Sequence, residues 1–316
     1  MAREPLDTLA AVRAAGKTGV ARTLTAIETA AGEDWLAALL DEAVANATGY
    51  VLGLTGPPGV GKSTLTSALV ATWRGEGLSV AVLAVDPSSR RSGGALLGDR
   101  TRMKTDPADE SVFIRSMAAR DRLGGLSDHS IAAVALLRAV YDMVLVETVG
   151  IGQSEGDIAL VADTIVLCVQ PGSGDSLQFM KAGIMELPDI VAVTKADMGD
   201  VARRAAADVE GALSLNHRAA DDWPVPVVQV SAPAATGVDG LVEAVRNHRD
   251  FMAEAGRLDA HRDRLHERWI REAVRESHGR TGLRQAEGLL SRTGHKCPFA
   301  AINRVAEALE GRPRLP

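Results

Sequence analysis

Seven short apolar runs, each bounded by turn-forming residues, divide the middle of the chain. They cover residues 50–55, 79–85, 111–115, 142–147, 164–170, 189–194 and 225–230. Unbroken apolar runs of this length are typical of strands that are buried on both faces. Helical patterns separate most of the runs or follow the last one, at residues 63–73, 126–140, 176–187, 201–214 and 241–251. This alternation predicts an α/β fold with a mostly parallel sheet flanked by helices.

Both ends of the chain carry helical patterns without strands. We therefore expect a helical extension over residues 1–47, an α/β domain over 48–249 and a helical arm over 250–316. The extension holds two helix-like segments, centred on residues 21–28 and 35–44. Neither end carries a residue pattern that suggests catalysis.

The arm is rich in arginine and amphipathic, with breaks at residues 279–282 and 294–298. Apolar side chains recur along it near heptad spacing, at Leu258, Leu265, Trp269, Ile270 and Val274. Such a stripe can pack back on its own domain or against a second subunit, and the pattern leaves both open.

Composition restricts the kinds of partner that we expect. The 316 residues are 46% hydrophobic and carry a net charge of −6 without a long basic run, so neither nucleic acid nor a membrane is expected as a main partner. The N-terminus lacks a signal-peptide pattern, which makes the cytoplasm the expected location. The two cysteines, Cys168 and Cys297, lie in no metal-site spacing.

Residues 56–63 read Gly-Pro-Pro-Gly-Val-Gly-Lys-Ser, between the first strand-like run and a helical pattern. In this motif backbone N–H groups surround the β-phosphate, Lys62 reaches the β and γ oxygens, and the Ser63 hydroxyl can bind Mg²⁺. A glycine-rich turn without a ligand is the alternative, but its strand and helix context argues against it. The expected phosphate-binding residues are Gly56, Pro57, Pro58, Gly59, Val60, Gly61, Lys62, Ser63, Thr64 and, from a later motif, Gly150.

A second motif favours guanine over adenine as the base. Residues 194–197 read Thr-Lys-Ala-Asp, one residue away from the Asn-Lys-x-Asp of GTPases. The Asp197 carboxylate can accept hydrogen bonds from guanine N1–H and the exocyclic amine, whereas adenine presents an acceptor at N1. Lys195 can lay its aliphatic stem over the base, and Ser231 with Ala232 can offer an N–H to guanine O6. Thr194 lacks the second polar atom of asparagine, so we expect weaker nucleotide affinity with the guanine preference intact.

Three carboxylates are candidates for metal binding and hydrolysis. Glu147 ends the fourth run and is followed three residues later by Gly150, whose N–H can approach the γ-phosphate. Glu147 could hold Mg²⁺, directly or through water, or orient the attacking water, and Asp86 could be an inner- or outer-shell carboxylate. Asp99 lies in a glycine-rich stretch that reads as a switch loop.

Taken together, these motifs identify a resemblance. The Asp-Pro-Ser-Ser at residues 86–89, the Gly-Asp-Arg-Thr-Arg-Met at 98–103 and the Glu-Thr-Val-Gly-Ile-Gly-Gln-Ser-Glu at 147–155 resemble the methylmalonyl-CoA mutase-associated GTPases of the MeaB/ArgK type. That family belongs to the metallochaperone-related branch of the SIMIBI class of P-loop proteins. The similarity spans roughly residues 20 to 250.

The resemblance implies a function that the residue patterns do not. It implies a homodimer joined through the C-terminal arm, which binds GTP or GDP with Mg²⁺ and chaperones an adenosylcobalamin-dependent acyl-CoA mutase, gating cofactor loading and protecting the enzyme. It also implies a third switch at residues 171–181, in which Lys181 relays the nucleotide state to the mutase. Three alternatives stay open: an ATPase or kinase linked to amino-acid transport, a metallochaperone GTPase, and a nucleotide-binding scaffold without turnover.

Overall fold

The computed structural model describes residues 6–86, 108–118, 126–148, 156–172, 186–215, 222–290 and 296–311. The chain forms two compact units. One unit combines residues 1–49, 128–141 and 259–316, and the other combines residues 50–127 and 142–258. We call them the helical unit and the sheet unit. The expected switch loop around Asp99, at residues 92–103, and all but the first two residues of the expected third switch at 171–181 lie outside the described part of the chain.

The sheet unit contains a seven-stranded sheet in which every strand pairing is parallel. Its strands are β1 (Tyr50–Thr55), β2 (Val80–Asp86), β3 (Val112–Ala118), β4 (Met143–Thr148), β5 (Thr164–Val169), β6 (Ile190–Val193) and β7 (Val227–Gln229). Each strand overlaps one predicted apolar run, which confirms the predicted α/β class, although β3 continues three residues beyond the run predicted at 111–115. The sheet is entirely rather than mostly parallel, because each connection brings the chain back to the end of the sheet at which the strands begin.

The strand order, β3-β2-β4-β1-β5-β6-β7, places β1 between β4 and β5. From β1 the chain first builds the side that holds β2, β3 and β4, and then crosses to build β5, β6 and β7. In open parallel sheets ligands bind beyond the carboxyl ends of the strands, where the order reverses. The loop after β1 therefore leaves the sheet at the position where a ligand is expected.

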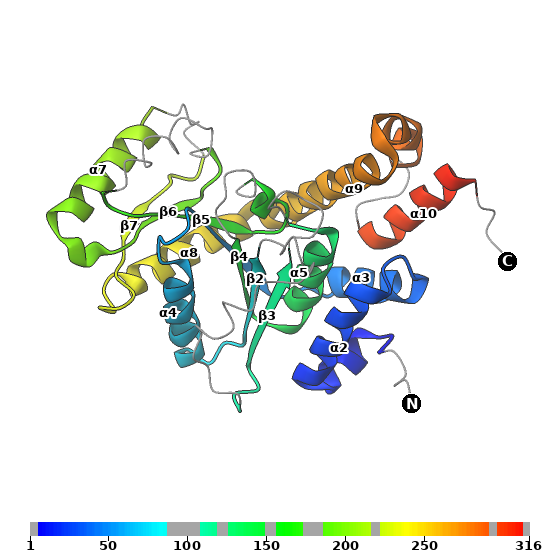
Figure 1. The fold of residues 1–316 in the computed structure, drawn as a ribbon, viewed down its shortest axis with the longest axis horizontal. Helices are drawn as coiled ribbons and strands as arrows, with labels where there is room; N and C mark the ends of the chain where they lie inside the picture. The colour runs from blue at the N-terminus through cyan, green and yellow to red at the C-terminus, as the bar shows by residue number, and fades with distance from the viewer. Residues whose placement is uncertain are drawn as a thin grey trace, which may run out of the picture. The chain divides into compact units, whose positions relative to one another are not determined.

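One face of the sheet is covered by α4 (Lys62–Gly75) and α8 (Val238–Ala253), which also contact each other (Figure 1). Alternate residues of the central strands point to this face, including Leu52 and Leu54 of β1. They join apolar side chains of both helices in one buried cluster. This packing fixes the direction of α4, whose first residue follows the loop after β1.

The other face carries α7 (Asp200–Leu213) over β5 and β6, and a short 3-10 helix (Asp157–Leu160) near β1. Gly53 of β1 leaves room for this short helix, since a Cβ at Gly53 would lie 2.7 Å from side-chain atoms of Ile158. The helix predicted over residues 201–214 is therefore confirmed, whereas the one predicted over 176–187 lies mostly outside the described residues.

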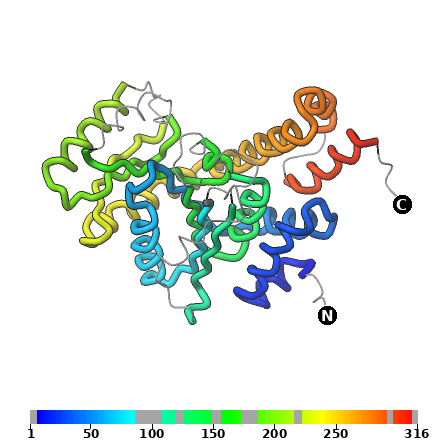
Figure 2. Tube along the Cα trace, viewed as in Figure 1, coloured from blue at the N-terminus to red at the C-terminus, as the bar shows by residue number. Residues whose placement is uncertain are grey.

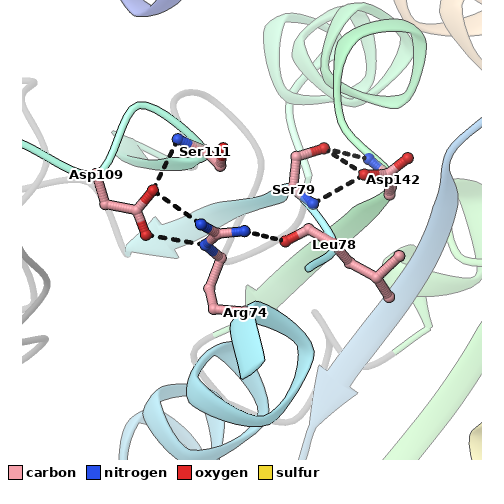
Figure 3. A network of polar contacts seen from close by, with 6 residues as sticks. All are labelled: Arg74, Leu78, Ser79, Asp109, Ser111 and Asp142. Atoms are coloured by element: carbon pink, nitrogen blue, oxygen red, sulfur yellow. Dashed lines mark hydrogen bonds and ion pairs between the residues drawn. The ribbon is translucent and has the colours of Figure 1, made fainter. Parts of the chain in front are cut away.

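At the end of the sheet where the strands begin, a polar network holds the C-terminal end of α4 (Figure 3). Arg74 donates two hydrogen bonds to the Asp109 carboxylate, at 2.9 and 3.1 Å, and a third to Leu78 O at 2.7 Å. Beside it, the Asp142 carboxylate accepts from the backbone N–H and the hydroxyl of Ser79. These bonds tie the end of α4 to the segments that enter β2, β3 and β4, so both ends of the helix are held in place.

The helical unit is built from segments that are far apart in sequence (Figure 2). Its helices are α1 (Leu9–Ala14), α2 (Gly16–Thr29), α3 (Asp34–Ala45), α5 (Asp128–Val140), α10 (Pro298–Glu310) and α9 (Arg257–Leu290), which belongs to this unit from residue 259 onward. Helix α3 packs against both α5 and α10. The short helix α1 is an addition to the two predicted N-terminal helices, and its Thr8 N-cap accepts a hydrogen bond from the Ala11 N–H.

The apolar stripe of the arm packs within the chain itself. Trp269 and Phe299 lie with ring centroids 4.8 Å apart, and Ile270 and Val274 join a buried cluster with residues of α10. Helix α9 is broken at Gly279, as predicted, where φ is 67° and ψ is −175°. Within the described ranges, no helix combines the length and apolar character needed to cross a membrane.

Candidate nucleotide-binding site

The loop between β1 and α4 takes a conformation that depends on glycine. Gly56 and Gly61 have φ angles of 137° and 101°. A Cβ at Gly56 would lie 2.3 Å from the backbone oxygen of Cys168, so any side chain there would displace β1 from β5. Only glycine meets both the steric and the backbone requirement at this position.

Helix α4 begins at Lys62, and its N-cap residue Gly61 provides no side-chain hydrogen bond. The first amides of a helix have no acceptor within the helix, and the helix dipole places partial positive charge beside them. This end of α4 therefore offers N–H groups to an anion, with Ser63 and Thr64 in its first turn.

Lys62 turns back over the loop that precedes it. Its side chain is 7% exposed, and Nζ donates to the backbone oxygens of Gly56 at 2.7 Å and Pro57 at 3.1 Å. Both carbonyls belong to the glycine-rich loop, so the ammonium group lies over the loop itself. A cation in this position is suited to neutralise phosphate oxygens that the loop would hold.

Glu147, near the end of β4, lies beside Leu54 of β1 in the sheet register and is 6% exposed. Its two carboxylate oxygens accept from the hydroxyl of Ser63 at 2.7 Å and from that of Thr66 at 3.1 Å. Hydroxyl and carboxylate oxygens are the ligands that Mg²⁺ prefers, and here they meet at the start of a helix that favours anions. The side chains fit a magnesium–phosphate ligand, and their roles as ligands stay predictions.

Cys168 of β5 lies close to the same groups but takes no part in their hydrogen bonds. Burial raises the pKa of its thiol to about 12, against the opposing effect of the nearby Lys62 ammonium. The thiol therefore stays protonated and serves as a small apolar side chain beneath the loop.

The loop that is predicted to read the base follows β6 and is linked through Thr194 to the glycine-rich loop, which is predicted to bind phosphate. The Thr194 hydroxyl lies 2.8 Å from Val60 O and 3.1 Å from Val169 O, so it joins the glycine-rich loop to the end of β5. A hydroxyl has one proton, which the two carbonyls must share. The sequence indicated what threonine lacks compared with asparagine, whereas the structure shows what its hydroxyl contacts.

Lys195 takes the left-handed conformation, with φ 55° and ψ 41°. Its Nζ donates to Gln170 Oε1 at 2.6 Å, just beyond the end of β5. Left-handed backbone is uncommon for residues other than glycine and often marks functional positions. Gln170 was not among the predicted site residues, because the pairing depends on strands β5 and β6 being neighbours.

Asp197 is exposed, and its Oδ1 accepts from the Ser231 hydroxyl at 2.6 Å. This hydrogen bond, with a second from its own backbone N–H, lowers the pKa of the Asp197 carboxyl. Ser231 is fully buried and is held by two backbone hydrogen bonds with Thr236, while Ala232 follows it at the surface of the loop. The carboxylate is thus ionised and oriented, as guanine recognition requires.

The structure brings together the two motifs that sequence analysis treated separately. Residues of the loop after β1, Glu147 of β4 and residues 194–197 after β6 all lie at the carboxyl edge of the sheet. Thr66 was missed in the sequence, although it lies on the same helix face as Ser63, three residues away. Asp99, Gly150 and Lys181 lie outside the described residues, as does the side chain of Asp86.

A parallel sheet with this strand order, a glycine-rich loop that leads into a helix, and the Thr-Lys-Ala-Asp motif after β6 define a P-loop GTPase of the SIMIBI class. Comparison with known proteins makes the assignment more specific. The family described as "Methylmalonyl Co-A mutase-associated GTPase MeaB" matches residues 20–283, and the chain belongs to this family.

Individual relatives agree with the family match. A putative GTPase of Pyrococcus horikoshii is 38% identical over 98% of this chain and 100% of its own length. The mouse protein named "Methylmalonic aciduria type A homolog, mitochondrial" is 37% identical over 83% of this chain and 66% of its own length. Among solved structures, one described as "Crystal structure of LAO/AO transport system kinase" superposes with a TM-score of 0.69 and 26% identity, over 96% of each chain.

Proposed function

We propose that this GTPase is the chaperone of an adenosylcobalamin-dependent acyl-CoA mutase, and that GTP hydrolysis gates the loading of the cofactor and protects the mutase. The observation that carries the proposal is the match to a family whose description names methylmalonyl-CoA mutase, over residues 20–283. The name of the mouse relative, which refers to methylmalonic aciduria, supports the same partner.

In the proposed reaction, the phosphate end of the site performs the chemistry. Lys62, already placed over the glycine-rich loop, neutralises the β and γ oxygens. Ser63 would supply a hydroxyl to Mg²⁺, and the Glu147 carboxylate, which accepts from that hydroxyl, would either hold the metal ion or orient the attacking water. When bound, Mg²⁺ would offset the negative charge that develops on the phosphoryl oxygens.

The base end of the site selects guanine. Asp197 is ionised at neutral pH, its pKa is lowered further by the Ser231 hydroxyl, and it accepts from guanine N1–H and the exocyclic amine. The aliphatic stem of Lys195 covers the base plane, and Ser231 with Ala232 offers a backbone N–H to guanine O6. The name of the structural relative, which refers to a transport kinase, suggests ATP as the alternative nucleotide. An aspartate at position 197 argues against it, since adenine would repel the carboxylate.

Communication with the partner is proposed to run through the switch segments. Asp86 and Asp99 would approach the metal, Gly150 the γ-phosphate, and Lys181 would transmit the nucleotide state to the mutase. Gln170, which bonds to Lys195, immediately precedes the segment that holds Lys181. A homodimer formed through the C-terminal arm completes the proposal.

The test is single-turnover hydrolysis of GTP with and without methylmalonyl-, ethylmalonyl- or isobutyryl-CoA mutase. We expect slow intrinsic hydrolysis that one of these mutases accelerates, because an ordered partner surface can complete the switch loops. The Lys181→Ala variant should keep its intrinsic rate and lose much of the stimulation. If none of the three mutases changes the rate, the chaperone function is refuted. If Lys181→Ala is stimulated fully, only the relay is refuted.

A further inference from the structure

Helix α9 carries a row of arginines on the face opposite its buried side. Arg264, Arg268, Arg271 and Arg275 are four, three and four residues apart, so they lie along one face of the helix over about 16 Å. All four are exposed. Trp269 and Ile270, which lie between them in sequence, are 3% and 4% exposed.

The row lines a concave surface. After the break at Gly279, Leu283 of α9 borders the same hollow, which has a volume of about 330 Å³. Glu267 and Glu272 also line it, one on each side of the row by helix geometry. Positive charge along the centre and negative charge at the edges form a pattern that a partner can match.

Part of the positive charge is already neutralised within the chain. Arg271 lies 3.2 Å from Glu287, and Arg268 lies 3.6 Å from Glu272. The side chains of Arg264 and Arg275, at the two ends of the row, have no ion pair or hydrogen bond with any residue in the described ranges. Like charges three or four residues apart are generally unfavourable on a helix.

From this pattern we infer that the arginine row is a docking surface for an acidic helix of another protein. Carboxylates spaced four, three and four residues apart on a partner helix would match the arginine spacing, and basic residues at its margins would meet Glu267 and Glu272. Arginine is suited to this role, because its planar group can bind a carboxylate through two parallel hydrogen bonds.

Two other occupants fit the surface less well. A symmetric dimer of this chain centred on the row would place arginines against the same arginines, because a two-fold interface pairs a patch with itself. The backbones of duplex nucleic acid border a groove about 12 Å wide, so they would fall on the flanking glutamates. Binding of single strands relies on aromatic stacking, and none of the residues that line the hollow is aromatic.

The test uses the full chain with GDP and a fluorescent helical peptide that carries glutamates at the matching spacing. A control peptide of the same composition has its glutamates distributed around the helix. We expect the matched peptide to bind at least about tenfold more tightly than the control, with affinity that falls as salt rises. The Arg264→Glu/Arg275→Glu variant should bind the matched peptide at least about tenfold more weakly. A peptide that carries lysines in place of the glutamates should bind this variant with the original affinity.

The Arg203→Glu/Arg204→Glu variant, on exposed positions of α7, is the matched control and should bind the peptide like the unaltered chain. Intrinsic GTP hydrolysis reports whether each variant is folded. If the charge-reversal variant Arg264→Glu/Arg275→Glu does not fold, Arg264→Gln/Arg275→Gln replaces it. Equal binding of both peptides, an equal loss in the α7 control, or tighter binding of duplex DNA overturns the proposal. So does self-association in sedimentation that depends on Arg264 and Arg275.

Discussion

At the phosphate end of the site, Lys62 and Glu147 are 7% and 6% exposed, whereas at the base end Lys195 and Asp197 are exposed. In the buried pair, Lys62 bonds to the glycine-rich loop and Glu147 to the first turns of α4. The exposed pair is oriented by one side-chain hydrogen bond each, from Ser231 and to Gln170. We therefore expect changes at the phosphate end to affect turnover and changes at the base end to affect affinity and selectivity.

The largest effect is expected for Lys62→Ala. Loss of the cation over the glycine-rich loop should lower kcat for GTP hydrolysis by at least about a hundredfold, as is typical when one charge-stabilising donor is removed. Lys195→Ala is the matched control at the base end, and should weaken GDP binding while leaving kcat within about threefold. Equal losses of kcat in both variants, measured in single turnovers, would contradict the difference between the two ends.

Glu147→Ala should lower kcat by about ten- to a hundredfold and GDP affinity much less. It should also lower the free energy of unfolding by about 1–3 kcal/mol, because the Thr66 hydroxyl is fully buried and loses its acceptor. Thr66→Val removes the same hydrogen bond but keeps the Glu147 carboxylate, and it should leave kcat nearly unchanged. Hydrolysis at the unaltered rate in Glu147→Ala would rule out both its metal role and its water role.

At the base end, Asp197→Asn should reduce the preference for GDP over ADP by about tenfold or more and favour xanthine nucleotides.

The pH dependence of GDP binding is a finer measure of the Asp197 carboxylate. The lowered pKa keeps the carboxylate ionised, and guanine binding is lost as the pH falls through that pKa. Ser231→Ala removes the main cause of the lowering, so its loss of GDP binding should occur at a higher pH. Calorimetric titrations over the acid range measure it, and superimposable pH profiles would exclude the role of Ser231.

Thr194 contacts both ends, and it tests how separate they are. Thr194→Val removes the hydroxyl shared by Val60 O and Val169 O and should weaken GDP binding by about three- to tenfold. Thr194→Asn supplies two N–H donors, one for each carbonyl, and should tighten it. Stopped-flow measurement of GDP release gives both values, and weaker binding in the asparagine variant would show that the hydroxyl is the better fit at this position.

The smallest effect is expected for Gln170→Ala, which releases the Lys195 ammonium at an exposed position. GDP and GTP affinities should fall together by about two- to threefold, with kcat unchanged. Gln170→Glu keeps an acceptor for Lys195 and should restore them. A change in kcat alone would instead assign Gln170 to the segment that follows it.

The sequence predicted every strand because each is a short apolar run, and it predicted the phosphate loop because eight consecutive residues carry the motif. It did not predict the side-chain partners. The Ser63–Glu147 and Lys195–Gln170 bonds join residues 84 and 25 positions apart, and they exist because particular strands are neighbours in the sheet. The order of those strands is a property of the chain path rather than of any local pattern. For the same reason, the apolar stripe of the arm left two packing partners open until Trp269 was seen against Phe299.

The two cysteines of the chain differ in a way that is useful for spectroscopy. Cys168 is buried with a pKa of about 12, whereas Cys297 is exposed at the N-cap of α10. Thiol reagents attack the thiolate, so a maleimide dye should label the folded protein at Cys297 alone, without any substitution. Labelling at Cys168 would then report opening of the sheet beneath the phosphate loop. The native chain thus provides both a site for a fluorophore on its C-terminal arm and an internal measure of local unfolding.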